Sequence, residues 1–236
     1  MKRAIIVGAS SGIGMEVAKR LKVEGWTIGV AARREERLRE LFPDDVAMPI
    51  DVLADDAPDQ LMALVEALGG VELYFHAAGI GWQNPQLDRD KEMATVATNA
   101  LGFTQMVDAM LGYMAEHGGG HIAVISSIAG TKGLGAAPAY SATKAFQNKY
   151  IEALEQLATM RKLDIRFTDI RPGFVATPLL DGKSFPMLMR SDYVARKIVG
   201  AINSGRRVAT IDWRWRIVVG LWRLIPRCIW CQLDIK

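Results

Sequence analysis

Three glycines between a short apolar run and a helical pattern constrain the fold of this chain more than any other feature. The run Ala4–Val7 is followed by Gly8-Ala9-Ser10-Ser11-Gly12-Ile13-Gly14. In the helical pattern that comes next, Ile13, Val17 and Leu21 recur every fourth position and form one apolar stripe. Glycine permits a tight turn and a close approach to a pyrophosphate, which the N-terminus of the following helix attracts. The segment therefore indicates a strand, a phosphate-binding loop and a helix, with a glycine-rich turn of another α/β protein as the alternative.

The same alternation of β-rich runs and helical patterns continues along the chain. Strands are expected at Ala4–Val7, Thr27–Ala31, Val46–Ile50, Val71–Phe75, His121–Ile125, Ile165–Ile170 and Val208–Ile211. Helices are expected at Gly12–Glu24, Glu35–Leu41, Asp56–Leu68, Lys91–Glu116 and Ala139–Arg161. The strands show little alternation, which is typical of a parallel sheet covered on both faces. We predict a single-domain Rossmann fold over residues 1–211, an α/β architecture with a doubly wound, seven-stranded parallel sheet and helices on both faces.

Positive charge is concentrated at the C-terminal end. The formal net charge of +3 is small and does not indicate a nucleic-acid partner. Residues 206–236 contain seven basic and two acidic residues, so this end carries +5 and the rest of the chain −2. No apolar run reaches the roughly 18 residues that a membrane-spanning helix requires. The N-terminus runs directly into the first strand, which does not resemble a signal peptide.

The only cysteines, Cys228 and Cys231, form a C-x-x-C near the C-terminus. A redox pair would open a helix after a strand, and a zinc site needs further ligands. The histidines, His76, His117 and His121, lie far away in the sequence. We therefore interpret the pair as incidental tail cysteines and expect no metal site. Without a disulfide framework the chain is predicted to be cytoplasmic.

The end of the second expected strand bears on the choice of dinucleotide. An NAD enzyme places an acidic residue there, on the ribose 2′-hydroxyl. Here the strand ends Ala31-Ala32-Arg33-Arg34. A carboxylate repels a 2′-phosphate, whereas a guanidinium binds it through charge-assisted hydrogen bonds. The pattern favours NADP(H) over NAD(H), although Arg33 and Arg34 are also compatible with the solvated start of a helix.

The strongest chemical motif is Tyr140-Ser141-Ala142-Thr143-Lys144 at the start of a long helix. Tyr and Lys four apart lie on one helix face, with Cβ atoms roughly 5–6 Å apart. The pKa of a tyrosine is about 10, too high for a good proton shuttle at neutral pH. A nearby ammonium, together with the positive nicotinamide ring of an oxidised cofactor, favours the phenolate and lowers that pKa. We therefore expect Tyr140 to act as general acid in reduction and general base in oxidation.

These motifs and the glycine loop resemble the short-chain dehydrogenase/reductase family over most of the chain. The family pairs this Tyr with a Ser thirteen positions earlier, which here is Ser127 and not Ser126. The resemblance implies that Ser127 hydrogen-bonds the substrate oxygen and shares the charge that develops there. It implies that Asn99, in Thr98-Asn99-Ala100-Leu101-Gly102, kinks its helix and holds a water in a relay to Lys144. The expected catalytic tetrad is Asn99, Ser127, Tyr140 and Lys144. Taken one at a time, each residue has a structural alternative: a turn residue for Asn99, a cap for Ser127, a helix-end packing residue for Tyr140 and a surface lysine for Lys144.

Three further segments resemble cofactor contacts of the family. In Ile50-Asp51-Val52, Asp51 resembles the adenine-contacting Asp, with a helix N-cap as the alternative. His76-Ala77-Ala78-Gly79 stands where the family usually has Asn-Asn-Ala-Gly, and it keeps the small Ala78-Gly79 pair beside the cofactor. We expect His76 to be buried and satisfied by backbone rather than catalytic. Arg171-Pro172-Gly173-Phe174-Val175-Ala176-Thr177 resembles the turn that holds the nicotinamide carboxamide, with Thr177 reaching the amide or a phosphate.

The substrate side and the tail are less specific. Residues 178–190 stand where the family carries a mobile lid, and their Leu, Met and Phe side chains suit a hydrophobic substrate. Gly79-Ile80-Gly81-Trp82 is expected to face that lid. The segment 212–236 is basic and rich in Trp and Arg, with Arg216, Arg223 and Arg227 along one helical face. It suits either peripheral contact with a membrane interface or packing beside the substrate cleft or a partner subunit.

The sequence therefore predicts an NADP(H)-dependent oxidoreductase that moves a hydride between nicotinamide and a small-molecule carbonyl or secondary alcohol. The resemblance also implies a homodimer or homotetramer that pairs through the helices Asn99–Glu116 and Ala139–Arg161. One alternative is a non-catalytic regulator or scaffold that binds the dinucleotide. Another is an epimerase or dehydratase on an extended scaffold, for which this chain leaves no room for a substrate domain.

Overall fold

The structure is a computed structural model that describes residues 2–180 and 185–235. In this described part, a seven-stranded sheet is formed by β1 (Arg3–Val7), β2 (Thr27–Ala32), β3 (Val46–Pro49), β4 (Leu73–His76), β5 (Gly120–Ile125), β6 (Ile165–Pro172) and β9 (Val208–Ile211). The strands pair in the order β3-β2-β1-β4-β5-β6-β9, and every pair is parallel. The expected fold class and all seven expected strands are confirmed. The chain reverses its direction of travel between β1 and β4, and ligands of open α/β sheets bind beside such a point.

The α-helices of the described residues are α1 (Gly12–Val23), α2 (Glu35–Leu41), α3 (Ala57–Leu68), α4 (Arg89–Val96), α5 (Phe103–Glu116), α6 (Pro138–Met160), α7 (Ser191–Asn203), α8 (Trp213–Leu224) and α9 (Arg227–Trp230). A π-helical turn, η1 (Ala97–Gly102), joins α4 to α5, and short 3₁₀ turns follow β5 and β7 as η2 (Ile128–Thr131) and η3 (Pro178–Leu180). A two-stranded parallel pair is formed by β7 (Val175–Ala176) and β8 (Met189–Arg190).

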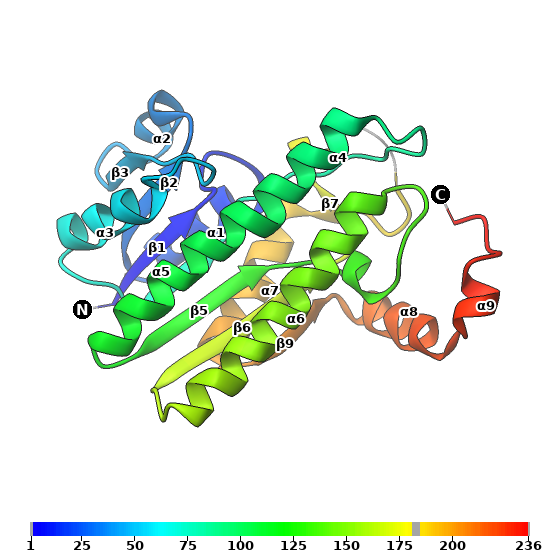
Figure 1. Cartoon of the computed structure of the whole chain (residues 1–236). Helices are drawn as coiled ribbons and strands as arrows, with labels where there is room; N and C mark the ends of the chain where they lie inside the picture. Colours follow the sequence, from blue (N-terminus) through cyan, green and yellow to red (C-terminus); the bar gives the residue numbers. More distant parts are fainter. Residues whose placement is uncertain (1, 181–184, 236) are drawn as a thin grey trace.

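The helices cover both faces of the sheet, and each face has its own apolar core. Side chains of α1, α2 and α7 pack on one face, with Leu21, Leu38 and Ile198 fully buried. Side chains of α3, α5 and α6 pack on the other, where Figure 1 shows α5 and α6 running along the sheet. Strands covered in this way lose the alternation of polar and apolar residues, which explains their uniform sequences.

Two features depart from the expected elements. The helix expected at Lys91–Glu116 is interrupted by η1, a π-helical turn that contains one more residue than an α-helical turn. Helix α5 begins after it. Such π-helical turns occur mostly at functional sites. Helix α7 was not among the expected helices, although its buried positions, which include Val194, Ile198 and Val199, repeat with helical spacing.

The C-terminal segment folds back onto the end of the domain beyond β9, where Figure 1 shows α8 and α9 at one end of the molecule. One face of α8 is buried, and its Trp215 and Val219 belong to the same core as α1 and α7. The opposite side of the helix is exposed. Helix α8 therefore packs on the domain along one face only.

Candidate active site

The glycine loop packs tightly against the end of β4. Gly8 has a φ of +91°, and a Cβ there would lie 2.6 Å from the backbone nitrogen of Ala78. A Cβ on Gly14 would overlap the carbonyl oxygen of Gly8. Residues larger than glycine at positions 8 and 14 would push the loop off β4. The glycines of the loop and the small residues Ala77 and Ala78 together therefore permit the close contact. This arrangement leaves the N-terminus of α1 facing the crevice, which fits a pyrophosphate.

Basic and polar side chains surround this loop. Arg34 donates a hydrogen bond from its guanidinium to Ser10 Oγ at 3.2 Å. Arg33 and Arg34 are both exposed, and within the described residues neither takes part in an ion pair. A Cβ on Gly12 would contact the Thr177 methyl at 3.2 Å, so the β6–α7 connection reaches the same loop. The surroundings of the loop therefore fit a dinucleotide that carries an additional phosphate.

The residues that follow β3 test one of the two expectations for Asp51, the helix N-cap. Asp51 is exposed, and its Oδ1 accepts a hydrogen bond from Leu53 N at 3.1 Å. It therefore caps the turn after β3, whereas Asp56 is the N-cap of α3. The alternative of a helix N-cap at Asp51 is wrong for α3. Val52 is buried, and its carbonyl oxygen lies 2.8 Å from where a Cβ on Gly102 would stand.

Asn99 lies in the π-helical turn and is fully buried. Its side-chain amide donates to the carbonyl oxygen of Ile80 at 2.7 Å, and its Oδ1 accepts from Ile80 N at 2.9 Å. A Cβ on Gly79 would lie 3.2 Å from Asn99 Oδ1 and 3.7 Å from Lys144 Nζ. The Asn99 side chain therefore fixes the segment after β4, and its neighbour Gly79 is small because Asn99 and Lys144 stand on either side.

Lys144 is the most unusual titratable group of the site. Its side chain is 4 % exposed, and its Nζ donates to the carbonyl oxygen of Ile125 at 3.0 Å and to Gln147 Oε1 at 2.9 Å. Burial lowers the pKa of Lys144 to about 8, and the nearby Asp169 carboxylate opposes that shift. A lysine with such a pKa is partly uncharged near pH 8, whereas an exposed lysine is almost fully charged there.

Tyr140 stands one turn before Lys144 on α6, and Lys144 Nζ lies 5.7 Å from the centre of its ring. Burial raises the pKa of Tyr140, and a hydrogen bond with Ser127 opposes that shift. The direction is opposite to the one expected for a tyrosine beside an ammonium and an oxidised nicotinamide, because desolvation of the phenolate outweighs the hydrogen bond with Ser127. Ser127 Oγ also accepts from Ala129 N at 3.1 Å and donates to the Pro172 carbonyl at 3.5 Å. The four expected side chains thus meet at the carboxyl ends of β4, β5 and β6.

A buried ion pair lies behind this group and escaped the sequence analysis. Asp169 is 2 % exposed and accepts hydrogen bonds from Arg171 Nε at 2.7 Å and from Ser126 Oγ. Ser126 therefore bonds to the core, and Ser127 is the one of the two that faces Tyr140. The alternation of a strand predicts this difference, since adjacent residues point to opposite faces.

His76 is fully buried, as expected, and the side chain of Tyr74 contacts it in addition to the backbone of Ala78. Its Nδ1 lies 2.9 Å from the Tyr74 hydroxyl, and its Nε2 has no partner among the described residues. Burial lowers the pKa of His76 to about 3, and the charge of Lys144 acts in the same direction. The imidazole therefore stays neutral, which argues for a packing role beside Phe103, whose ring it meets edge-on.

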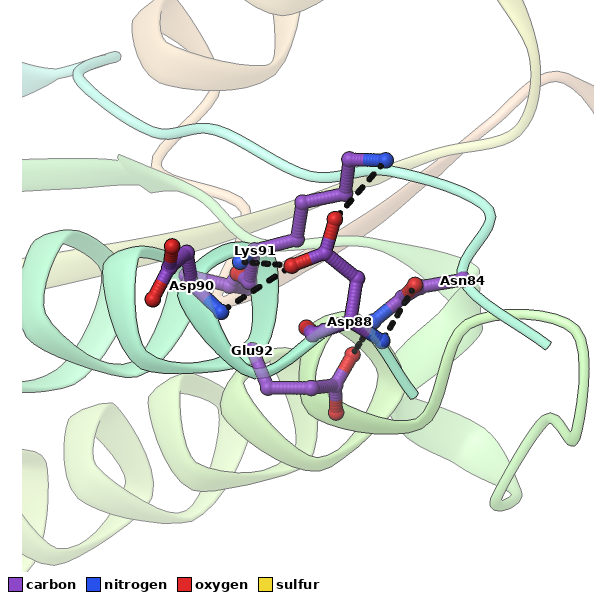
Figure 2. A network of polar contacts seen from close by, with 6 residues as sticks. Asn84, Asp88, Asp90, Lys91 and Glu92 are labelled. Carbon is purple, nitrogen blue, oxygen red and sulfur yellow. Dashed lines mark hydrogen bonds and ion pairs between the residues drawn. The ribbon is translucent and has the colours of Figure 1, made fainter. Parts of the chain in front are cut away.

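The N-terminus of α6, which presents Tyr140, is held by a side chain from another helix. The N-cap residue Ala137 offers no side-chain acceptor. Instead Glu92 of α4 accepts from Ala139 N at 2.9 Å with one oxygen, and from Asn84 Nδ2 at 2.8 Å with the other. Figure 2 shows Asn84 hydrogen-bonded both to Glu92 and to Asp88, which is the N-cap of α4. The network ties the loop after Trp82 to the start of the helix with Tyr140.

The expected wall of the substrate side lies next to Tyr140, and the tail lines a cavity further along the chain. A Cβ on Gly81 would overlap the Tyr140 ring, so Gly79-Ile80-Gly81-Trp82 passes directly over the tyrosine. The expected lid at 178–190 is described in part, and residues 181–184 lie outside the described residues. Beyond Trp82 a cavity of about 710 Å³ is lined by loop and tail residues, among them Gln83, Pro85, Leu134, Ala136, Trp230 and Leu233.

Two contacts fasten the tail to the loop between η2 and α6. Trp230 Nε1 donates to the Gly133 carbonyl at 2.7 Å, and Lys132 Nζ donates to the Ile225 carbonyl at 2.8 Å. At the other end of α8, Trp215 occupies the space that a Cβ on Gly173 would need. One face of the tail therefore packs on the domain and on the loop between η2 and α6.

The sequence profile of short chain dehydrogenases matches residues 2–185. The chain belongs to this family. A short-chain dehydrogenase is an oxidoreductase that acts on CH–OH or C=O groups, which confirms the expected class of activity. Among curated relatives, an uncharacterized oxidoreductase of Myxococcus xanthus is 30 % identical and covers 95 % of this chain and 93 % of its own. One of Mycobacterium tuberculosis is 30 % identical and covers 96 % and 95 %.

Solved structures of other short-chain dehydrogenases share the fold. Actinorhodin polyketide ketoreductase with NADPH is 27 % identical, covers 89 % of this chain and 95 % of its own, and superposes with a TM-score of 0.78. A short-chain dehydrogenase of Burkholderia cenocepacia in complex with NADP covers all of both chains at 19 % identity and a TM-score of 0.86. One of Burkholderia phymatum was solved in complex with NAD at 20 % identity and a TM-score of 0.83, covering 93 % and 92 %. Nicotinamide dinucleotides are thus bound by structural relatives of this short-chain dehydrogenase, in both forms.

Proposed function

We propose that the protein is an NADP(H)-dependent reductase or dehydrogenase of a hydrophobic carbonyl or secondary alcohol. The observation that carries the proposal is the buried Lys144 ammonium within 5.7 Å of the Tyr140 ring, beside a Ser127 that hydrogen-bonds the phenol. Bound nicotinamide supplies or accepts the hydride. Tyr140 transfers the proton to or from the substrate oxygen, and Ser127 orients that oxygen. Lys144 exchanges a proton with Tyr140, and Asn99 holds the turn around them.

The cofactor site is proposed to consist of the glycine loop, two arginines and three strand ends. Its residues are Gly8, Ser10, Ser11, Gly12, Ile13, Gly14, Arg33, Arg34, Asp51, Val52, Ala77, Ala78, Gly79, Tyr140, Lys144, Pro172, Gly173, Val175 and Thr177. The hydrogen bond from Arg34 to Ser10 supports a preference for NADP(H), because it places an unpaired guanidinium over the loop.

A titration with NADPH and with NADH, followed by nicotinamide fluorescence, tests the cofactor preference. We expect NADPH to bind at least about tenfold more tightly, because a charge-assisted hydrogen bond contributes roughly 1.5–3 kcal/mol. Arg34→Ala should remove most of that difference without weakening NADH. Arg37→Ala is the matched control, since Arg37 is exposed on α2 and pairs with Glu40. Equal affinities in the wild type would overturn the NADP(H) assignment.

The alternative of a non-catalytic dinucleotide sensor is separated from an enzyme by Tyr140→Phe. The assay screens apolar aldehydes and ketones with NADPH and follows the oxidation of NADPH by its absorbance at about 340 nm. The enzyme loses roughly 10²–10⁴-fold in rate without its general acid. A substrate with a long apolar portion is favoured because Leu134, Trp230 and Leu233 line the cavity beyond Trp82. Full turnover by the Phe variant would argue against the proposed acid, and cofactor binding without turnover of any carbonyl would favour the sensor.

We further propose that residues 1–211 form the catalytic domain of a cytoplasmic homodimer or homotetramer. Val96, Leu101 and Phe146 are exposed on α4, η1 and α6, which are neighbouring elements, and a second copy would cover them. Cys228 and Cys231 are free and exposed, which supports a reducing compartment. Light scattering of the wild type and of Phe146→Asp tests the pairing, and a monomeric wild type would refute it.

The exposed face of α8 supports peripheral contact of segment 212–236 with an anionic membrane surface. Trp213, Ile217, Leu221 and Leu224 recur at helical spacing opposite the buried face and are 55–79 % exposed. Within the described residues, Arg216, Arg223 and Arg227 are exposed and take part in no ion pair. Like charges disfavour a second copy of the same face, whereas anionic headgroups complement them. Among the described helices, none is both long and apolar enough to cross a membrane.

Sedimentation with vesicles tests this contact. We expect binding to vesicles that contain phosphatidylglycerol, weak binding to phosphatidylcholine alone, and loss of binding in Ile217→Gln/Leu221→Gln. The matched control is Val23→Gln, because Val23 is an 80 % exposed apolar residue on α1. Equal sedimentation of the double variant would remove α8 from the contact, and concentration-dependent association without vesicles would identify the partner as a second copy.

A further inference from the structure

The side chain of Gln147 occupies the centre of the site, although no catalytic motif contains it. Gln147 is fully buried, three residues after Lys144 on α6. Its Oε1 accepts a hydrogen bond from Lys144 Nζ at 2.9 Å, and its Nε2 donates to the backbone carbonyl of Asn99 at 2.9 Å. Both ends of the amide are thus used, one on the lysine and one on the π-helical turn.

A buried glutamine is costly unless it is hydrogen-bonded, and a hydrophobic residue is the ordinary choice on the buried face of a core helix. The neighbouring buried positions of the same face, Ile151 and Leu154, are apolar. Gln147 therefore belongs to the buried polar part of α6, which also holds Thr143, Lys144 and Asn148, and the buried positions become apolar only from Ile151 onward. Of these polar neighbours, Gln147 is the one whose side chain bonds to the buried lysine.

The groups that face Lys144 come from four elements, α6, β5, β6 and β4. Tyr140 lies on α6, and the carbonyl of Ile125 ends β5. Asp169 on β6 attracts the ammonium, but its carboxylate is already bonded to Arg171 and Ser126. His76 on β4 is neutral and offers no charge. Gln147 thus supplies one of the two acceptors that contact the ammonium directly.

We propose that Gln147 is a positioning residue that holds Lys144 against the end of β5 and joins it to the turn that carries Asn99. This inference rests on the proposed function of Lys144. Because a side-chain amide does not exchange its protons as water does, the bond to Asn99 fixes orientation and is not a route by which a proton leaves the lysine. The family resemblance implies that Asn99 holds a water in a relay to Lys144; in this protein the Asn99 backbone carbonyl accepts a hydrogen bond from the Gln147 amide.

The test is a titration of Lys144 itself, which requires neither substrate nor cofactor. The full chain is labelled with [ε-¹³C]lysine, the Lys144 resonance is assigned by its absence in Lys144→Met, and its chemical shift is followed with pH. A hydrogen-bond acceptor favours the charged form of an amine. Gln147→Leu, which has no acceptor, should lower the midpoint by about one pH unit, whereas Gln147→Glu, with a carboxylate, should raise it.

The matched control is Asn148→Ala, because Asn148 is the next residue of α6 and is also a buried amide, and it makes no hydrogen bond to Lys144 among the described residues. Its stability is expected to change and the Lys144 midpoint to stay. Equal midpoints for wild type and Gln147→Leu, or shifts of both Gln147 variants in one direction, would overturn the inference. If Gln147→Leu does not fold, the upward shift in Gln147→Glu decides.

Failure of this inference and failure of the proposed function have different signatures. If the enzyme reduces carbonyls through Tyr140 but the Lys144 midpoint does not change in Gln147→Leu, the proposed function stands and the positioning role of Gln147 is refuted. If the midpoints are as expected but the protein turns over no carbonyl, the positioning role of Gln147 stands and the proposed function is refuted. In the active enzyme, the alkaline limb of kcat against pH should move with the NMR midpoint in both variants.

Discussion

Replacing Glu92 by alanine should destabilise the protein and weaken the start of α6. The carboxylate accepts two hydrogen bonds, from Asn84 Nδ2 at 2.8 Å and from Ala139 N at 2.9 Å. A net hydrogen bond to a charged group contributes about 1.5–3 kcal/mol, and the lower end applies because Glu92 is partly exposed. At this lower end the two bonds together correspond to roughly 3 kcal/mol.

The loss is measured by urea unfolding, and a thermal scan should show a decrease of roughly 4–12 °C for a chain of this size. Glu92→Gln should lose about half as much, because its single oxygen can serve Ala139 or Asn84 but not both. The matched control is Glu66→Ala, since Glu66 is an exposed glutamate on α3 and should change stability by no more than about 0.5 kcal/mol.

A loss for Glu92→Ala that equals the loss for Glu66→Ala would refute the reasoning. It would mean that the first turn of α6 is held by packing of Pro138 and Ala139 alone. Tyr140 follows directly on that turn. A variant that keeps its stability is therefore also expected to keep the full rate of carbonyl reduction, which gives the same experiment a second readout.

Three further perturbations follow from the contacts of the site. Asp169→Ala leaves the Arg171 guanidinium buried and unpaired, so unfolding in urea should show a loss of about 3–5 kcal/mol, whereas Glu152→Ala in an exposed pair should cost less than about 1 kcal/mol; similar losses for the two would contradict the buried pair. Gly14→Ala places a methyl group on the Gly8 carbonyl and should weaken NADPH binding at least about tenfold, while Gly200→Ala, where no atom lies within 4 Å, should bind normally and gain stability. The pKa of Lys144 is lowered to about 8, so its ammonium is lost as pH rises through that value, and kcat for hydride transfer should fall above pH 8. A rate that stays constant to a pH of about 10 would show that the charge of Lys144 is not needed.

The sequence was sufficient to predict the sheet and the closeness of Tyr140 to Lys144, for different reasons. Strands covered on both faces have uniform apolar runs that are visible without any partner, and all seven were located from them. Tyr140 and Lys144 share one helix, so their spacing alone places them together. The glycine loop could be predicted in the same way, because Gly8 and Gly14 are close in the sequence and only glycine fits their contacts.

What could not be predicted depends on contacts between distant segments. The carboxylate of Glu92 reaches Ala139 across 47 positions, and the Gln147 amide reaches Asn99 across 48. Neither residue belongs to a local pattern, since a glutamate on a helix is ordinarily solvated and a glutamine ordinarily exposed. The tail was ambiguous because α8 has two apolar faces, and only the fold decides that Trp215 and Val219 are inside and Leu221 is outside.

The pairing of Gly173 with Trp215 restricts how this enzyme can change. A side chain at position 173 would need the volume that the indole fills, so any such residue must arrive together with a smaller one at position 215. Position 173 belongs to the turn proposed to hold the nicotinamide, and position 215 to the helix whose continuation lines the apolar cavity. Attempts to redesign the tail for a new substrate will therefore change the affinity for cofactor at the same time, unless Trp215 is retained.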